Sequence, residues 1–406
     1  MKFLHAADLH LDTPFQGLTG VPSALRSQLI AAPLTALTRL VNLAITEQVD
    51  FVLLVGDLFD QQAQSVAAQA GLMAALERLN VARIPVVLSF GNHDYQPAGS
   101  QWHFPANVHA FGPSVKTVTL TTADQTQVAI SGFSYDQRWV TTPKIADYPA
   151  KLPTVDYHIG MLHGQLGTAG DHYAPFSVGE LLAKHYDYWA LGHIHQRQTL
   201  NTVPPVVYPG NLQGRYRDET GQKGCLIVES QADQTLRPVF HALAPITWTT
   251  WTPKLQGPVD RPTLLKQLVD QFSTTAEDGT ELVLITLPTT VELSATAMLA
   301  LTQGALLTQL QGQLTTTACW PVDLQLAADK SQPVLGGLDQ AVWQQAGQRV
   351  VTTEQIAALA DHLLAEPFLN QTLLEDLTPA QWRQRVLGLL QEQYHLTTEG
   401  GAADGD

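Results

Sequence analysis

The stretch FVLLVGDLFD, residues 51–60, holds the pattern that decides the fold of this chain. Five consecutive apolar residues predict a buried strand, and a polar block with potential metal ligands follows where that strand ends. The same arrangement occurs four more times in the first half of the chain. Apolar runs at residues 2–7, 86–90, 157–162 and 188–191 are followed by Asp8-Leu9-His10, Gly91-Asn92-His93-Asp94, His163-Gly164 and Gly192-His193-Ile194-His195.

We expect the five blocks to meet at one edge of a sheet, because the carboxyl ends of strands in α/β folds are where loops converge without disturbing the core. Apolar residues at helical spacing predict one helix starting at Pro33 and another from Val66 to Leu79. Short apolar runs at 115–120 and 127–132 predict further strands. The alternation of strands and helices predicts an α/β fold with sheet between helical layers.

The ligand types favour a transition metal. Imidazole nitrogens mixed with carboxylate and amide oxygens, without thiolate, suit Mn²⁺ or Fe²⁺ and are compatible with Zn²⁺. An all-oxygen Ca²⁺ or Mg²⁺ site would not use histidines. The donors outnumber the positions around one ion, and a carboxylate such as Asp57 can bridge two ions about 3.5 to 4 Å apart. The sequence therefore predicts two divalent metal ions, with Mn²⁺ favoured.

Taken together and in this order, the blocks resemble the calcineurin-like metallophosphoesterases, whose pattern is D-x-H, GD-x-x-D, GNH-D, a His followed by Gly, and GH-x-H. FLHAADLHLD, residues 3–12, and YPGNLQGRYRDETGQKGC, residues 208–225, are most similar to the branch of SbcD-type DNA repair exonucleases and YhaO-like proteins. The resemblance covers roughly residues 1–245. It implies a two-sheet αββα sandwich, which periodicity alone does not separate from other α/β arrangements.

The resemblance also implies a role for each block. One metal ion would be held by Asp8, His10, Asp57 and His195, and the other by Asp57, Asn92, His163 and His193. His93 would contact the phosphate and protonate or stabilise the leaving oxygen, with Asp60 orienting its ring. Taken alone, Asp8 or Asp57 could cap a turn and His163 could be an ordinary buried histidine, but the ordered series favours ligands. We expect Asp94 to support its own loop.

The net charge of −15 argues against binding a polyanion until its distribution is considered. Residues 1–250 hold 15 Lys and Arg against 19 Asp and Glu, whereas residues 251–406 hold 7 against 18. A basic group formed by Arg197, Arg215, Arg217 and Lys223 follows the last block, with Tyr208 and Tyr216 between them. It either guides a nucleic-acid strand into the site or belongs to a solvated surface loop, and the sequence does not decide between these.

The rest of the chain predicts additional parts. Residues 1–245 would form the nuclease domain, 246–262 a proline-rich linker, 263–340 an α+β capping domain, 350–395 a helical segment and 397–406 a disordered tail. Within the capping domain, helices are expected at 263–272 and 294–314 and strands at 281–287 and 319–326. The apolar faces of segment 350–395 either dock a partner or pack on their own domain.

The favoured function is that of an Mn²⁺-dependent exonuclease subunit acting on DNA in repair. The resemblance implies a coiled-coil SbcC-like ATPase as partner, and a homodimer is left open. Two alternatives remain: a phosphoesterase acting on nucleotides, cyclic nucleotides or pyrophosphates, and a non-catalytic scaffold of the same fold. The start of the chain does not resemble a signal peptide, and the sequence has no uninterrupted run of about 18 apolar residues, so we expect a cytoplasmic protein with no membrane contact.

Overall fold

The computed structural model describes residues 1–327, apart from 14, 16, 17, 19, 61–64, 98–101, 273–278 and 315–317, together with residues 349 and 352. The chain divides into two compact units, Met1–Ala327 and Ala328–Asp406. Nearly all of the second unit lies outside the described residues. Apart from residue 352, the predictions for 350–395, 397–406 and the end of the capping domain at 328–340 therefore concern residues that are not described.

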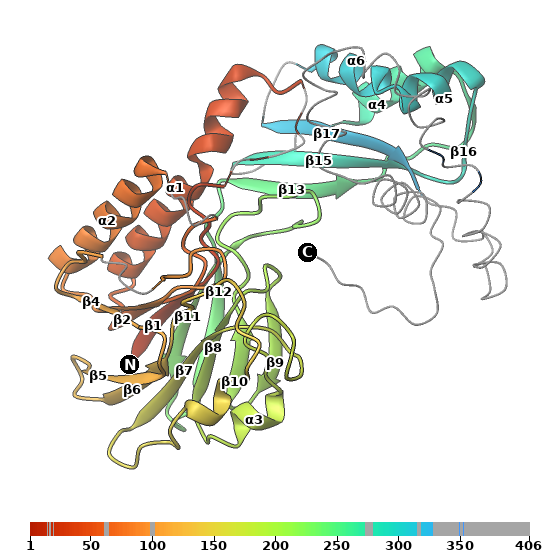
Figure 1. Ribbon diagram of the computed structural model, residues 1–406. Helices are drawn as coiled ribbons and strands as arrows, with labels where there is room; N and C mark the ends of the chain where they lie inside the picture. The colour runs from red at the N-terminus through yellow and green to blue at the C-terminus, as the bar shows by residue number, and fades with distance from the viewer. Residues whose placement is uncertain are drawn as a thin grey trace. The chain divides into compact units, whose positions relative to one another are not determined.

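Two six-stranded sheets form the core of the N-terminal part (Figure 1). The order of the first sheet is β12 (Leu236–Ala242), β11 (Gly224–Ser230), β1 (Lys2–Ala6), β2 (Phe51–Val55), β3 (Val86–Ser89), β4 (Val108–Ala110). The order of the second is β5 (Lys116–Thr121), β6 (Gln127–Gly132), β7 (Tyr157–His163), β8 (Tyr188–Gly192), β10 (Pro205–Tyr208), β9 (Gln198–Thr202). The two sheets share a core in which Phe3 and Phe51 from the first are buried with Ile130 and Ile159 from the second.

Helices cover the outer faces. Helices α1 (Ser23–Thr46) and α2 (Val66–Val81) pack on the first sheet, whose buried side chains form one cluster with theirs. On the second sheet, α3 (Val178–Leu182) and the short 3₁₀ helix η1 (Ile145–Asp147) belong to a cluster around Trp189. The predicted αββα sandwich is confirmed, and the strands expected before the five blocks are β1, β2, β3, β7 and β8.

Helix α1 differs from the prediction, because it begins at Ser23 and contains Pro33 in its interior. Proline inside a helix removes a hydrogen bond at a cost of about 3 kcal/mol. A buried stripe that runs from Leu25 to Ala44 continues through Pro33, and its packing offsets that cost. By length and composition α1 is apolar enough to span a membrane, but 44% of its most apolar window is buried inside the protein. The buried stripe explains this hydropathy as that of a core helix.

The C-terminal part of the described chain is a smaller α+β module. Its parallel sheet has the order β13 (Ile246–Trp251), β15 (Thr280–Leu287), β17 (Cys319–Leu326), and β14 (Gly257–Val259) pairs with β16 (Val291–Leu293). Its helices are α4 (Arg261–Gln271), α5 (Ala295–Thr302) and α6 (Ala305–Gln313). The strands predicted at 281–287 and 319–326 are present as β15 and β17.

Two expectations for this module are corrected. Residues 246–262 do not form a linker, because β13 pairs along its whole length with β15 and β14 is a strand as well. No proline lies within β13; Pro258 lies in the short strand β14 and Pro262 in the first turn of α4, where a proline is tolerated. The single helix expected at 294–314 is two helices, separated by Gly304 at φ +71°. Glycine adopts this left-handed conformation without steric cost, so the chain turns there.

Candidate metal centre

The five blocks do converge at one edge of the sandwich. Strands β1, β2 and β3 run parallel to one another, as do β7 and β8, so their carboxyl ends carry the blocks side by side. Backbone bonds then tie the loops together: Asp8 N donates to Gly56 O at 3.1 Å and His10 N to Asp57 O at 3.1 Å. The first two ligand loops are therefore fixed relative to each other before any side chain is considered.

The backbone at the ligands is strained. Asp8, His10, Asp57 and His193 have φ values of +53°, +42°, +48° and +104°. Residues other than glycine adopt this region at a cost of order 1–3 kcal/mol each, and such costs are concentrated at functional sites. A Cβ at Gly91 would lie 2.2 Å from Asp57 Oδ1, so only glycine fits at that position. The strained backbone at these positions brings the ligands close together.

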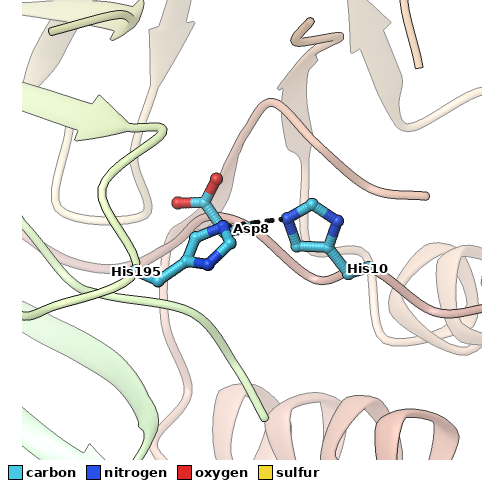
Figure 2. A group of neighbouring side chains, drawn as sticks. All are labelled: Asp8, His10 and His195. Atoms are coloured by element: carbon cyan, nitrogen blue, oxygen red, sulfur yellow. Dashed lines mark hydrogen bonds between the residues drawn. The ribbon is translucent and has the colours of Figure 1, made fainter. Parts of the chain in front are cut away.

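The first half of the centre contains Asp8, His10 and His195. The Nε2 atoms of His10 and His195 lie 3.1 Å apart, and the two rings face each other beside Asp8 (Figure 2). One ligand atom of each of the three residues lies within 4.8 Å of those of the other two. Two imidazole nitrogens that face each other beside a carboxylate form a donor set that suits a divalent cation.

The second half contains Asp57, Asn92, His163 and His193. Asn92 Oδ1 lies 3.0 Å from His163 Nε2 and 3.1 Å from His193 Nδ1. Ligand atoms of Asp57, His163 and His193 again lie within 4.8 Å of one another. An amide oxygen, a carboxylate and two imidazoles form the nitrogen and oxygen donor set expected for Mn²⁺ or Fe²⁺.

Asp57 connects the two halves. Its Oδ2 lies 3.4 Å from His163 Nε2 and 3.7 Å from His10 Nε2, while its Oδ1 accepts a hydrogen bond from His93 N at 3.0 Å. One carboxylate oxygen is therefore close to a histidine of each half. Such a position fits a carboxylate that bridges two ions.

The first half is oriented by ionised side chains. His195 Nδ1 donates to Glu219 Oε1 at 2.6 Å, and His10 Nδ1 lies 3.3 Å from Asp60 Oδ1. Arg215 connects the two carboxylates: its guanidinium contacts the Asp60 carboxylate, and its backbone N donates to Glu219 Oε2 at 2.6 Å. We call these five residues, His10, Asp60, Arg215, Glu219 and His195, the supporting ring. A carboxylate on the far nitrogen of a ligand histidine fixes its tautomer and raises its basicity.

The second half is oriented by the main chain. His163 Nδ1 donates to the carbonyl of Val55 at 3.1 Å, which leaves Nε2 as the nitrogen with a free lone pair. The buried carboxylate of Asp94 accepts from the backbone N of Gly91 at 2.7 Å and of Leu58 at 2.7 Å, and so joins two ligand loops. Burial, followed by the neighbouring charge of Asp57, raises the pKa of Asp94 to about 7.

The protonation states of the first half suit metal binding. Burial, with the positive charge of Arg215, lowers the pKa of His10 to about 3, so this ring is neutral near pH 7. Burial opposes ionisation of Glu219, but its interactions with His195 and Arg215 together outweigh burial and bring the pKa of Glu219 to about 2. A neutral imidazole supported by an ionised carboxylate is the form that coordinates a cation.

The electrostatics of the second half favour a positive charge next to the Asp57 carboxylate. Burial alone would lower the pKa of His163, but the charge of Asp57 and its bond to His163, together with the charge of Asp8 and the Val55 carbonyl, outweigh burial and raise that pKa to about 9. Although burial opposes it, His163 in turn holds the pKa of the Asp57 carboxyl well below its ordinary value. The pocket around Asp57 therefore stabilises a cation, which a divalent metal ion supplies when it displaces the proton.

His93 and Asp60 lie beside the first half. The His93 side chain is 37% exposed, and its Nδ1 lies 2.7 Å from the main-chain oxygen of Asp60. The Asp60 carboxylate lies farther from that nitrogen, at 4.0 Å, and points instead to His10 and Arg215. Asp60 thus contacts the His93 ring through its main-chain carbonyl. Ligand atoms of His10, Asp60 and His93 also lie close enough together to hold a metal ion. The Asp60 carboxylate, however, contacts Arg215, and His93 Nδ1 contacts the Asp60 carbonyl.

The predicted basic group divides in the structure. Arg215 is only 4% exposed and belongs to the supporting ring, and Lys223 Nζ donates to the His195 carbonyl at 2.8 Å. Arg197 is exposed and lies over the ring of Phe240, with 3.8 Å from its Cζ to the centroid. Arg217 is exposed and lies 3.6 Å from Asp323. The three arginines do not form one surface, and Arg215 is occupied by protein partners.

Sequence reasoning missed Glu219 and Asn211, whose Nδ2 donates to Glu219 Oε2 at 2.8 Å. Both lie in the segment 208–225, which carries the resemblance but contains no metal-ligand spacing. The segment is also anchored to the C-terminal module: Trp248 Nε1 donates to Gly214 O at 3.2 Å and Gln213 Nε2 to Ile246 O at 2.8 Å. Only the fold shows that this segment returns to the metal centre.

Comparison with known proteins finds similarity to one family over the part of the chain that carries the metal centre. Residues 1–197 match the model described as calcineurin-like phosphoesterase. The chain is 41% identical over 235 residues to an uncharacterized metallophosphoesterase, YhaO, of Bacillus subtilis strain 168, covering 56% of this chain and 57% of that protein. The matched stretch thus spans little more than half of that relative's length.

Two weaker relatives carry functional names. The SbcD component of the nuclease SbcCD from Staphylococcus epidermidis is 26% identical over 274 residues, covering 61% of this chain and 70% of that protein. The DNA double-strand break repair protein Mre11 of Thermoplasma acidophilum is 25% identical over 195 residues, covering 44% and 50%. Among solved structures, the protein TT1561 of Thermus thermophilus aligns with a TM-score of 0.34 at 14% identity, covering 59% of this chain and 98% of that one.

Proposed function

We propose that this chain, whose N-terminal part is a calcineurin-like metallophosphoesterase domain, hydrolyses phosphodiester bonds in DNA with two divalent metal ions. The observation that carries the proposal is the position of Asp57, whose Oδ2 lies within 3.7 Å of a histidine nitrogen in each half of the centre. Two ions held by one bridging carboxylate form the arrangement that clamps a phosphate in an in-line displacement.

The chain's own residues have distinct roles in this reaction. Asp8, His10 and His195 would hold one ion and Asn92, His163 and His193 the other, with Asp57 shared. When bound, the ions supply an activated water and neutralise charge on the phosphate oxygens. His93 Nδ1 is engaged by the Asp60 carbonyl, so Nε2 is the nitrogen that would donate a proton or hydrogen bond to the leaving oxygen.

The choice of DNA, of Mn²⁺ and of a role in repair rests on similarity and ligand chemistry. The Staphylococcus relative is named as part of a nuclease and the Thermoplasma relative as a break-repair protein. Imidazole mixed with carboxylate and amide oxygen suits Mn²⁺, with Fe²⁺ and Zn²⁺ as alternatives. We also propose that the enzyme is cytoplasmic, the compartment that holds the DNA of Staphylococcus and Thermoplasma, the sources of the two named relatives.

One experiment tests the proposal directly. Purified protein loaded with Mn²⁺ is offered bis-p-nitrophenyl phosphate, single-stranded DNA and linear duplex DNA side by side. We expect hydrolysis of the small diester and of DNA, both abolished by chelation. Hydrolysis of nucleotides or pyrophosphates without any attack on DNA would show the alternative phosphoesterase instead, and no hydrolysis of any substrate would leave a scaffold.

We also propose that residues 350–395 dock a coiled-coil SbcC-like ATPase. The support is the helical spacing of apolar residues in that segment and the name of the Staphylococcus relative, which makes it one component of a larger nuclease. Deleting the chain after residue 345 should abolish co-purification with the ATPase while sparing hydrolysis of the small diester. A folded truncated protein that still binds the ATPase as tightly as the full chain would refute the docking role.

A further inference from the structure

An exposed tryptophan lies beyond the second half of the metal centre. Trp139 is 53% exposed, and the guanidinium carbon of Arg138 lies 5.9 Å from its ring centroid. A single exposed apolar residue is common on protein surfaces, whereas a series of rings that ends at a metal ligand indicates a binding surface.

Trp139 belongs to such a series. Its ring centroid lies 5.4 Å from that of His172, with an interplanar angle of 35°. His172 is 6.2 Å from Tyr173, and Tyr173 is 4.4 Å from His193 at an interplanar angle of 36°. His193 is a ligand of the second half, so contiguous rings connect the solvent-exposed Trp139 to the centre.

The series is held in place by the backbone. Val140 N donates to His172 O at 2.8 Å, and Ala174 N donates to Val140 O at 2.8 Å, so the two segments that carry the rings are bonded to each other. Gln165 N donates to Tyr173 O at 3.0 Å, which ties the same segments to the loop that follows the ligand His163. The rings are thus fixed relative to the metal centre, as a binding surface requires.

The chemistry of this surface fits nucleobases. Aromatic faces stack on the π face of any base, so the recognition tolerates every sequence, and Arg138 adds positive charge for a phosphate. Two acids lie nearby: the Asp171 carboxylate accepts from Thr168 N at 2.7 Å within its own turn, and Asp136 is exposed. Bases inside a duplex are stacked on one another and present no free face. The bases of a single strand do present a free face, on which an aromatic side chain can stack.

We propose, resting on the function proposed above, that Trp139, His172 and Tyr173 form a stacking surface for unpaired bases next to the phosphate held at the metal centre. This surface makes single-stranded nucleic acid, or a frayed end, the preferred substrate. Stacking contributes about 1–3 kcal/mol per base by alanine substitution, so loss of one ring should weaken use of a single strand roughly tenfold or more.

The test compares three substrates and three variants. Wild type, Trp139→Ala, Trp139→Phe and, as a matched control, Ile30→Ala, which removes an apolar side chain 72% exposed on α1, are assayed with Mn²⁺. The substrates are a single-stranded oligothymidine, a blunt duplex and bis-p-nitrophenyl phosphate, which has no base. KM and kcat are determined separately, because stacking of a neighbouring base acts mainly on KM.

We expect Trp139→Ala to raise KM for the oligothymidine roughly tenfold or more, with a smaller effect on the other two substrates. Trp139→Phe should recover most of the loss, and Ile30→Ala should behave as wild type. Equal loss on single strand and duplex, or no change on either, would overturn the stacking surface while DNA hydrolysis by wild type upholds the proposed function. If wild type hydrolyses the small diester but no DNA, both the nuclease function and this surface are wrong.

Discussion

The two halves of the metal centre are alike in ligand types and different in how those ligands are held. In the first half, His10 and His195 are oriented by ionised side chains of the supporting ring, with Glu219 supplied 24 residues beyond His195. In the second half, His163 is oriented by the carbonyl of Val55, the residue that ends β2. The second half thus depends on the strand ends themselves, whereas the first depends on a distant segment and on its charges.

The shared residue should show the largest effect, because it belongs to both halves. Asp57→Asn keeps the shape of the side chain but removes the charge that both halves use, so we expect loss of both metal ions and of all hydrolysis. The loss of metal affinity should exceed the roughly 10–100-fold typical of a residue that only orients a ligand. Metal content after gel filtration measures it, with the exposed Asp233→Asn as control. Retention of one ion at full occupancy would show that Asp57 serves a single half.

The next largest effect should come from a residue that belongs to neither half. His93→Ala should leave both ions bound but slow turnover by about 10² or more, the usual scale for loss of a general acid or charge-stabilising donor. Metal content and kcat are measured on the same preparation, with the exposed His103→Ala as control. If His93→Ala and Asp57→Asn lose the same amount of metal, His93 is a ligand and its assigned role is wrong.

A third change separates the two halves. Glu219→Gln removes the charge that orients His195, so metal affinity should fall about 10–100-fold in the first half alone. Calorimetric titration of the metal-free protein with Mn²⁺ should show one weakened step and one unchanged step. The exposed Glu77→Gln on α2 is the control. An equal shift of both steps, or of neither, would contradict the division into a charge-supported and a backbone-supported half.

The smallest effect concerns His5, a buried histidine of β1. Its ring nitrogens lie 3.0 Å from Tyr188 Oη and 3.1 Å from Leu191 O. Burial lowers the pKa of His5 to about 3. An unfolded histidine titrates near pH 6.5, so between these values the unfolded chain binds more protons and the free energy of unfolding falls as the pH falls.

From about pH 7 to about pH 5, His5 should reduce the stability of wild type by about 2 kcal/mol more than that of His5→Gln. Urea unfolding of both proteins without metal isolates this difference, because the ligand histidines titrate in both. A constant stability gap across this pH range would mean that His5 is not neutral in the fold. The difference between wild type and His5→Gln measures how burial of one non-ligand histidine makes the stability depend on pH.

The contrast between the halves also explains what the sequence could predict. Apolar runs that end in Asp57 or His163 predict both the strands and the ligands, because strand period and ligand position are local properties. The support of His163 by Val55 comes with the strand itself. The support of His195 by Glu219 depends on a long-range return of the chain, for which no local spacing gives a signal.

The same limit accounts for the errors elsewhere. Residues 246–251 read as a linker because prolines flank them, although their partner strand β15 begins only at Thr280. Pro33 read as a helix start because the tertiary packing that carries α1 through it cannot be seen in the local pattern. Asp60 contacts His93 through its main-chain carbonyl, and its carboxylate is engaged by Arg215, 155 residues away, which no local spacing indicates.

The anchoring of segment 208–225 has a consequence for how this protein can change in evolution. Glu219 reaches His195 from a segment whose neighbours Gln213 and Gly214 bond to Ile246 and Trp248 of the C-terminal module. The composition of the sequence places a domain boundary at 245, but an exchange of modules at that point would remove these bonds. A recombinant protein joined there would inherit every ligand block and lose part of what orients one of them. We therefore expect relatives that differ in the C-terminal module to differ in the segment 208–225 as well.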